Sequence, residues 1–180
     1  MKTKKIASIS IFSALIIILQ TISTNINFGG FPITLTLVPI IISGAVYGVA
    51  FGTLMGLVFG VCVSVMVVVG ADPNGATMFA YHPAVTIAIC LVKGVLSAFL
   101  GSYIYRKVKN KKIGILLSAI TTPVVNTLTL FVGLILFFDY GFSSLIAGVT
   151  SINFIIEVLL NVAIAPALLP LIIKTTKRYV

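Results

Sequence analysis

The sequence contains very few charged residues, and acidic residues are the scarcest of them. Charged residues make up 8% of the 180 residues, whereas a soluble domain carries about 25%. The acidic residues are Asp72, Asp139 and Glu157. This composition excludes a soluble globular protein, and it also excludes a disordered chain, which needs many more polar residues. With three carboxylates, catalysis by paired acidic residues is disfavoured. The chain also has too few polar residues for a nucleotide-hydrolysing domain.

Histidine and cysteine are scarce as well, and tryptophan is absent. Cys62 and Cys90 both fall within apolar runs at a spacing that matches no metal motif, so each is expected to be a small buried hydrophobe. His82 is the single histidine and has no cysteine or acidic companions, which disfavours a metal site. The G-x-S-x-G, H-E-x-x-H and Walker-type motifs are missing. We therefore expect no metal, no cofactor and no enzymatic activity.

Long apolar runs dominate the sequence, with 59% hydrophobic residues and a mean hydropathy of +1.24. A membrane-spanning helix needs about 20 apolar residues, so a chain of this length holds about six spans. The runs predict spans over residues 6–22, 32–47, 51–70, 84–105, 113–138 and 142–173. Residues 1–180 are thus predicted to form one all-α domain, a polytopic membrane protein with six transmembrane helices.

The connections between these spans are short, and the longest polar one covers residues 71–83. It contains Asp-Pro and Asn-Gly pairs, which are typical of turns, so we predict an outer loop there. Tyr81 and His82 lie at its end, beside Pro83. They are candidates to close over a ligand, and the alternative is that they belong to the membrane interface without contacting one.

Every basic residue except Lys93 belongs to one of three clusters, at 2–5, 106–112 and 174–178. Basic proteins often bind nucleic acid, but short cytoplasmic loops of membrane proteins also accumulate Lys and Arg. With six spans, both termini and the 106–112 linker fall on the same side. The pattern therefore predicts cytoplasmic N- and C-termini, membrane lipid rather than nucleic acid as the surroundings, and a location in the cell membrane.

Polar side chains inside the predicted spans mark the candidate site. A charge near the bilayer centre costs roughly 3 kcal/mol on insertion scales, so it usually has a partner or a function. Lys93 and Asn126 lie at similar depths in the fourth and fifth spans. Asn153, Glu157 and Asn161 are spaced by four residues and so share one face of the last span. One interpretation is a Lys93–Glu157 ion pair with asparagines bonding between helices. The other is a solute pocket in which Lys93 neutralises an anionic group and the asparagines bind amide or hydroxyl groups.

Small residues follow helical spacing in two places. Glycines recur every fourth residue from 44 to 60, and this pattern predicts close helix packing, either within the hairpin formed by the second and third spans or against a partner protein. A smaller group lies on the first span, comprising Ala7, Ser10 and Ala14.

Four segments give the chain a resemblance to a known family. They are the small-residue face of the first span, LTLVPIIISGAVYGVAFGTLMGLVFG, ICLVKG and PVVNT. Over nearly its whole length the chain resembles the substrate-binding S component of bacterial energy-coupling factor (ECF) vitamin transporters. The resemblance implies a six-helix subunit without its own ATPase activity. Such a subunit binds a vitamin from outside, then docks on a transmembrane T component and two ATPase subunits to release it inside. It also implies docking through an A-x-x-x-A motif, in which Ser10 here replaces the first alanine.

Within that family the chain looks most similar to the pantothenate type, with Lys93 where an arginine is expected and Asn126 at the polar position of the fifth span. Pantothenate has one carboxylate, one amide and two hydroxyls, which suits one cation and several asparagines. Biotin, folate, riboflavin and hydroxymethylpyrimidine are the alternative vitamins. From another class, the alternative is a small assembly or regulatory subunit whose polar residues only hold helices together.

Overall fold

The computed structural model describes residues 2–24, 27–28, 31–32, 34–141, 143, 146–147 and 151–178. These residues are almost entirely helical, which confirms the predicted all-α class. The elements, in chain order, are α1 Lys2–Thr24, β1 Asn27–Phe28, β2 Phe31–Pro32, α2 Leu37–Tyr47, α3 Val49–Val68, α4 Pro73–Tyr81, α5 Pro83–Lys107, α6 Lys111–Phe137 and α8 Ile152–Arg178. The two strands form a minimal antiparallel pair in which Phe28 lies opposite Phe31.

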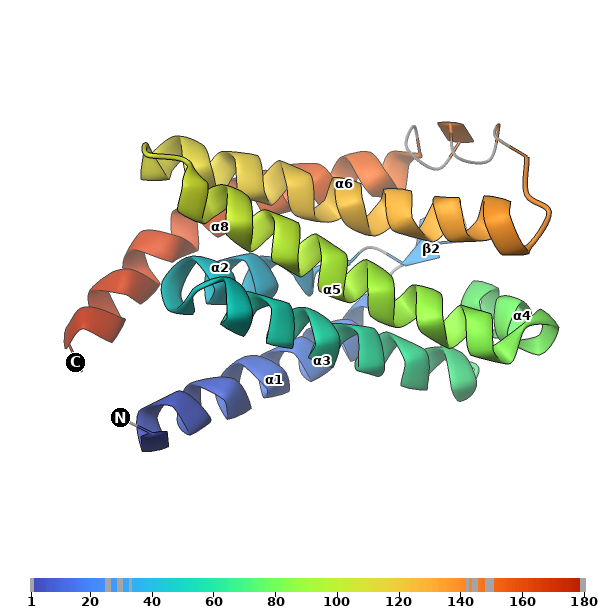
Figure 1. The fold of residues 1–180 in the computed structure, drawn as a ribbon, viewed down its shortest axis with the longest axis horizontal. Helices are drawn as coiled ribbons and strands as arrows, with labels where there is room; N and C mark the ends of the chain where they lie inside the picture. Colours follow the sequence, from blue (N-terminus) through green and yellow to red (C-terminus); the bar gives the residue numbers. More distant parts are fainter. Residues whose placement is uncertain are drawn as a thin grey trace.

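Five of the described helices, α1, α3, α5, α6 and α8, are long and apolar enough to cross a membrane. They run along the long axis of the molecule, and α5 packs between α3 and α6 (Figure 1). The predicted ends of the spans over α3, α5 and α6 agree with the structure to within two residues. The predicted start of the last span, Phe142, lies outside the described residues, and α8 begins at Ile152.

The predicted span over residues 32–47 corresponds to the shorter helix α2. Its 11 residues extend about 17 Å at 1.5 Å per residue, and the hydrocarbon core is about 30 Å thick. A strand and a turn occupy the first part of the predicted span. Every residue from Leu37 to Ala45 is buried, so the apolar character of this segment reflects packing among the other helices. Hydropathy alone does not distinguish such burial from exposure to lipid.

The segment predicted to be a loop at residues 71–83 contains helix α4, so that prediction was wrong. The Asp-Pro pair begins the helix, because Asp72 is its N-cap and Pro73 its first residue. The Asp72 carboxylate accepts a hydrogen bond from the Gly75 amide at 3.2 Å. Proline is favoured at the first helical position and aspartate at the N-cap. The Asp-Pro pair that is typical of a turn therefore begins a helix here.

Glycines allow α3 to approach its neighbours closely. A Cβ atom on Gly56 would overlap both the Gly94 carbonyl oxygen and the Ala98 side chain of α5. In the α2–α3 hairpin, a Cβ atom on Gly52 would lie 2.8 Å from the Gly44 Cα. The glycine repeat is thus confirmed as internal packing, and α5 is a partner in addition to the hairpin itself.

The two ends of the molecule differ. The chain termini and the α5–α6 linker lie at one end, and α4 lies at the other (Figure 1). All three basic clusters of the sequence therefore gather at the end opposite α4. This arrangement is the one that the positive-inside pattern requires, and the cytoplasmic orientation of that end stays a prediction.

Candidate functional site

A cavity that is partly open to solvent lies among the helices. Helices α1, α3, α4, α5, α6 and α8 all contribute to its wall, and Phe59, Phe131 and Phe154 supply aromatic surface. Its polar lining consists of Gln20, Thr34, Asp72, Asn74, Thr86, Lys93, Asn126, Thr127, Ser151, Asn153 and Glu157. Because α4 is part of the wall, the cavity reaches toward the end of the molecule opposite the chain termini (Figure 1).

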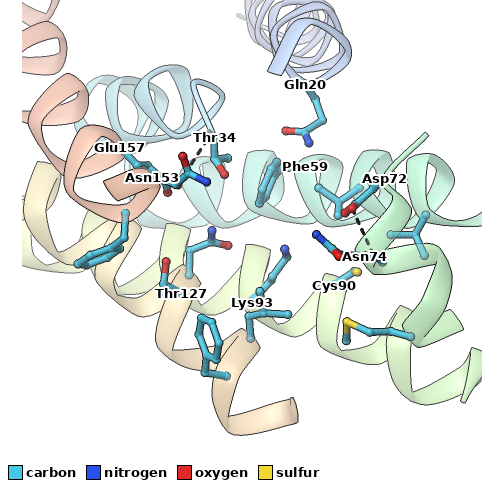
Figure 2. A pocket seen from close by; sticks show the side chains of 18 of the residues that line it. Gln20, Thr34, Phe59, Asp72, Asn74, Cys90, Lys93, Thr127, Asn153 and Glu157 are labelled. Carbon is cyan, nitrogen blue, oxygen red and sulfur yellow. Dashed lines mark hydrogen bonds between the residues drawn. The ribbon is translucent and has the colours of Figure 1, made fainter. Parts of the chain in front are cut away.

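Lys93 extends from α5 into this cavity (Figure 2). It is half-buried, and within the described residues its ammonium group forms no hydrogen bond or ion pair. The Lys93–Glu157 ion pair, one of the two interpretations of the sequence, is therefore not formed in the structure, although both side chains line the same cavity. Asp72 and Glu157 also line the cavity, but neither carboxylate is paired with the ammonium group, so Lys93 can bind an anionic group of a ligand directly.

Asn126 of α6 and Glu157 of α8 both line the cavity. Both residues are nearly buried, at 5% and 6% exposure. The Glu157 Oε2 atom accepts a hydrogen bond from the Thr34 amide at 3.4 Å, while Asn126 Oδ1 and Glu157 Oε1 have no donor among the described residues. A buried acceptor without a donor costs about 1–3 kcal/mol. These two atoms are accordingly suited to a ligand that supplies N–H or O–H groups.

The two remaining asparagines of α8 differ in their surroundings. Asn153 lines the cavity one turn before Glu157. Asn161 is buried one turn after it, does not line the cavity, and donates from Nδ2 to the Glu157 carbonyl oxygen at 2.8 Å. The structure thus brings together Lys93, Asn126, Asn153 and Glu157, whereas Asn161 supports the helix beneath them.

The two predicted loop residues lie apart from this group. Tyr81, the last residue of α4, is 77% exposed. The His82 ring packs edge-on against Phe138 at a centroid distance of 5.5 Å. Neither side chain lines the cavity. This placement corresponds to the interfacial alternative considered for them.

The polar residues of the cavity that were not expected from the sequence include Gln20, Thr34, Asp72 and Asn74. Gln20 lies close to the end of the first predicted span, where a polar residue is unremarkable. Asp72 and Asn74 belong to the segment that we interpreted as a loop. Only the fold of α4 back over α3 and α5 brings them to the cavity, and no local pattern indicates that.

The small residues of the first span all lie on the surface. Ala7, Ser10 and Ala14 are exposed on α1, and at three- and four-residue spacing they share one face. The Ser10 hydroxyl donates to the Ile6 carbonyl oxygen at 3.2 Å within the helix. The face is therefore shallow and has little free hydrogen-bonding capacity, as a close helix–helix contact requires.

Comparison with known proteins identifies the family. The family model "ECF transporter, substrate-specific component" matches residues 4–169. The chain is 25% identical, over 96% of its length and 95% of the relative's, to the pantothenic acid transporter PanT of Lactococcus lactis subsp. cremoris strain MG1363. No solved structure gives a significant match. With its apolar helices, the chain is a multi-pass protein of the cell membrane, and it belongs to the substrate-specific components of ECF transporters.

Proposed function

We propose that the cavity binds pantothenate and that the chain delivers it to the cell interior as part of an ECF transporter. The observation that carries this proposal is that one cavity is lined by a cation without an ion pair, Lys93, and by two residues whose side-chain oxygens have no donor among the described residues, Asn126 and Glu157. Pantothenate has one carboxylate for the cation, and its amide N–H and two hydroxyls are donors for the oxygens. The name of the Lactococcus lactis relative supports the same ligand.

The charges that line the cavity also disfavour vitamins whose own charge differs from that of pantothenate. A cationic vitamin such as thiamine would place a second positive charge in the cavity with Lys93, and only pairing with Asp72 or Glu157 would compensate it. A ligand with two carboxylates would need a second cation, and Lys93 is the one basic residue among those that line the cavity. Biotin carries a single carboxylate and is therefore the main competitor.

Native mass spectrometry of the purified protein tests the assignment directly. We expect a bound small molecule with the mass of pantothenate, one per chain, when the protein is produced by cells supplied with the vitamin. Mild heating should release it, and added pantothenate should restore it. A bound species with the mass of biotin or of another vitamin would contradict the proposal.

We further propose that the exposed face of Ala7, Ser10 and Ala14 docks on the T component, which acts together with two ATPase subunits. Replacing Ala14 with tryptophan is expected to prevent assembly of the complex, because an indole would hold the two helices several ångströms apart. Co-purification of the T component measures this, and pantothenate binding should persist because Ala14 does not line the cavity. Ala88→Trp, at an exposed position of α5, is the matched control. Complex assembly by Ala14→Trp at the wild-type level would refute the docking face.

A further inference from the structure

Gln20 stands out because it belongs to α1, yet its side chain reaches the cavity. The residue is 4% exposed and lines the cavity wall. Figure 2 shows its amide pointing inward, on the side of the cavity across from Lys93. Ala7, Ser10 and Ala14 of the same helix are exposed. Helix α1 thus contributes to the inside of the cavity as well as to the proposed docking face.

The orientation of this amide follows from one hydrogen bond. The Thr36 hydroxyl, which is fully buried, donates to Gln20 Oε1 at 2.8 Å. With its oxygen held there, the amide turns Nε2 away from Thr36. Within the described residues Nε2 donates to no acceptor. The result is an N–H donor that faces the cavity and is fixed by a neighbour.

We propose that Gln20 is a further ligand-contacting residue, that its Nε2 donates to a neutral acceptor of the bound molecule, and that Thr36 positions it. This inference rests on the proposed function. Lys93, Asn126 and Glu157 account for an anion and for donor groups of the ligand, but the carbonyl oxygen of an amide needs a donor. Pantothenate has one such carbonyl, and Gln20, opposite Lys93, supplies the complementary N–H.

The Thr36 contact is one of a series of hydrogen bonds made by the segment just before α2. Three consecutive residues of the chain before α2 form hydrogen bonds with two helices of the site, α1 and α8. The Thr34 amide donates to Glu157 Oε2 of α8, and the Leu35 amide donates to Ser23 Oγ of α1 at 3.3 Å. Thr36 then donates to Gln20. This short segment therefore fixes Gln20 relative to Glu157, so the two groups are held at a set separation across the cavity.

The test compares two ligands by isothermal titration calorimetry on the full chain: pantothenate and panthenol, in which an alcohol replaces the carboxylate. Gln20→Met removes the amide at similar volume, and we expect it to weaken both ligands by the same factor, about fivefold to tenfold. Thr36→Val should weaken both about threefold, and Thr36→Ser, which keeps the hydroxyl, should bind like the wild type. Thr21→Val, at the neighbouring exposed position of α1, is the control and should change neither affinity.

Several results would overturn the inference. An affinity of Gln20→Met within twofold of the wild type would show that the amide serves only α1–α2 packing. A loss confined to pantothenate would place Gln20 on the carboxylate, against the proposal. Wild-type affinity in Thr36→Val would refute the positioning role. If Gln20→Met does not fold, the Thr36→Val and Thr36→Ser pair decides by the same criterion. A wild-type chain that binds neither ligand would refute the proposed function, and this inference would fail with it.

Discussion

Replacement of Lys93 with alanine is expected to weaken pantothenate binding by about 2 to 3 kcal/mol, roughly 30- to 150-fold. The ammonium group points into the cavity, where it forms no ion pair with the described residues, although Asp72 and Glu157 line the same cavity. Its interaction with a ligand carboxylate would be partly shielded from water. A charge pair in such a site contributes far more binding free energy than one at the protein surface. Equilibrium titration of the purified variant measures the loss.

The analogue panthenol separates this charge effect from a general disturbance of the site. It lacks the carboxylate, so the wild type should bind it weakly, and Lys93→Ala should bind it about as well as the wild type does. Lys93→Arg keeps the cation and should retain pantothenate affinity within about tenfold, since arginine can also form a bidentate pair with a carboxylate. An unchanged pantothenate affinity in Lys93→Ala would refute the role assigned to this residue.

Replacement of Gly56 with valine is expected to have the largest effect on stability. A Cβ atom at this position would overlap the Gly94 carbonyl oxygen, which is backbone and has no other rotamer to adopt. Helices α3 and α5 would have to separate, and overpacking of this kind costs at least about 3 kcal/mol, or roughly 6–12 °C in Tm. Because Lys93 adjoins Gly94 in the chain, the same displacement should also weaken ligand binding.

Gly114→Ala is the matched control for this experiment. Gly114 is also a buried helical glycine, but the nearest atoms to its Cβ position lie 3.4 Å away or more. Alanine should fit there, and its higher helix propensity should leave Tm unchanged or slightly raised. Thermal unfolding in detergent, followed by loss of helical circular dichroism, measures both variants. Equal Tm values for Gly56→Val and Gly114→Ala would contradict the packing described for α3 and α5.

The sequence predicted most of the fold because a bilayer imposes simple rules. Helices α3, α5 and α6 follow from uninterrupted apolar runs, whose ends polar and basic residues mark within two positions. The short helix α2 could not be recognised as short, because the mean hydropathy of the segment stays high despite Pro32, Thr34 and Thr36, which precede the helix. Helix α4 was missed because an Asp-Pro pair is favoured both in turns and at the start of a helix, where Asp72 is the N-cap and Pro73 the first residue.

The site was predictable where a residue is unusual for its surroundings. Lys93, Asn126 and Glu157 stand out because charges and amides are rare in apolar helices. The sequence placed Lys93 and Asn126 at similar depths, and all three residues line the cavity. Gln20 and Asp72 are not unusual at span ends. Their approach to the cavity depends on the packing of α1 against α2 and α3 and on the packing of α4 against α3 and α5, which are tertiary properties without a local signature.

Competition binding tests whether the protein binds pantothenate selectively over other vitamins. The purified full-length protein would be titrated with radiolabelled pantothenate, and unlabelled pantothenate, biotin, riboflavin, folate and hydroxymethylpyrimidine would be added as competitors. We expect saturable binding of one pantothenate per chain, displaced by unlabelled pantothenate and not by a similar excess of the other vitamins. Absence of saturable binding, or displacement by biotin at lower concentration than by pantothenate, would contradict it.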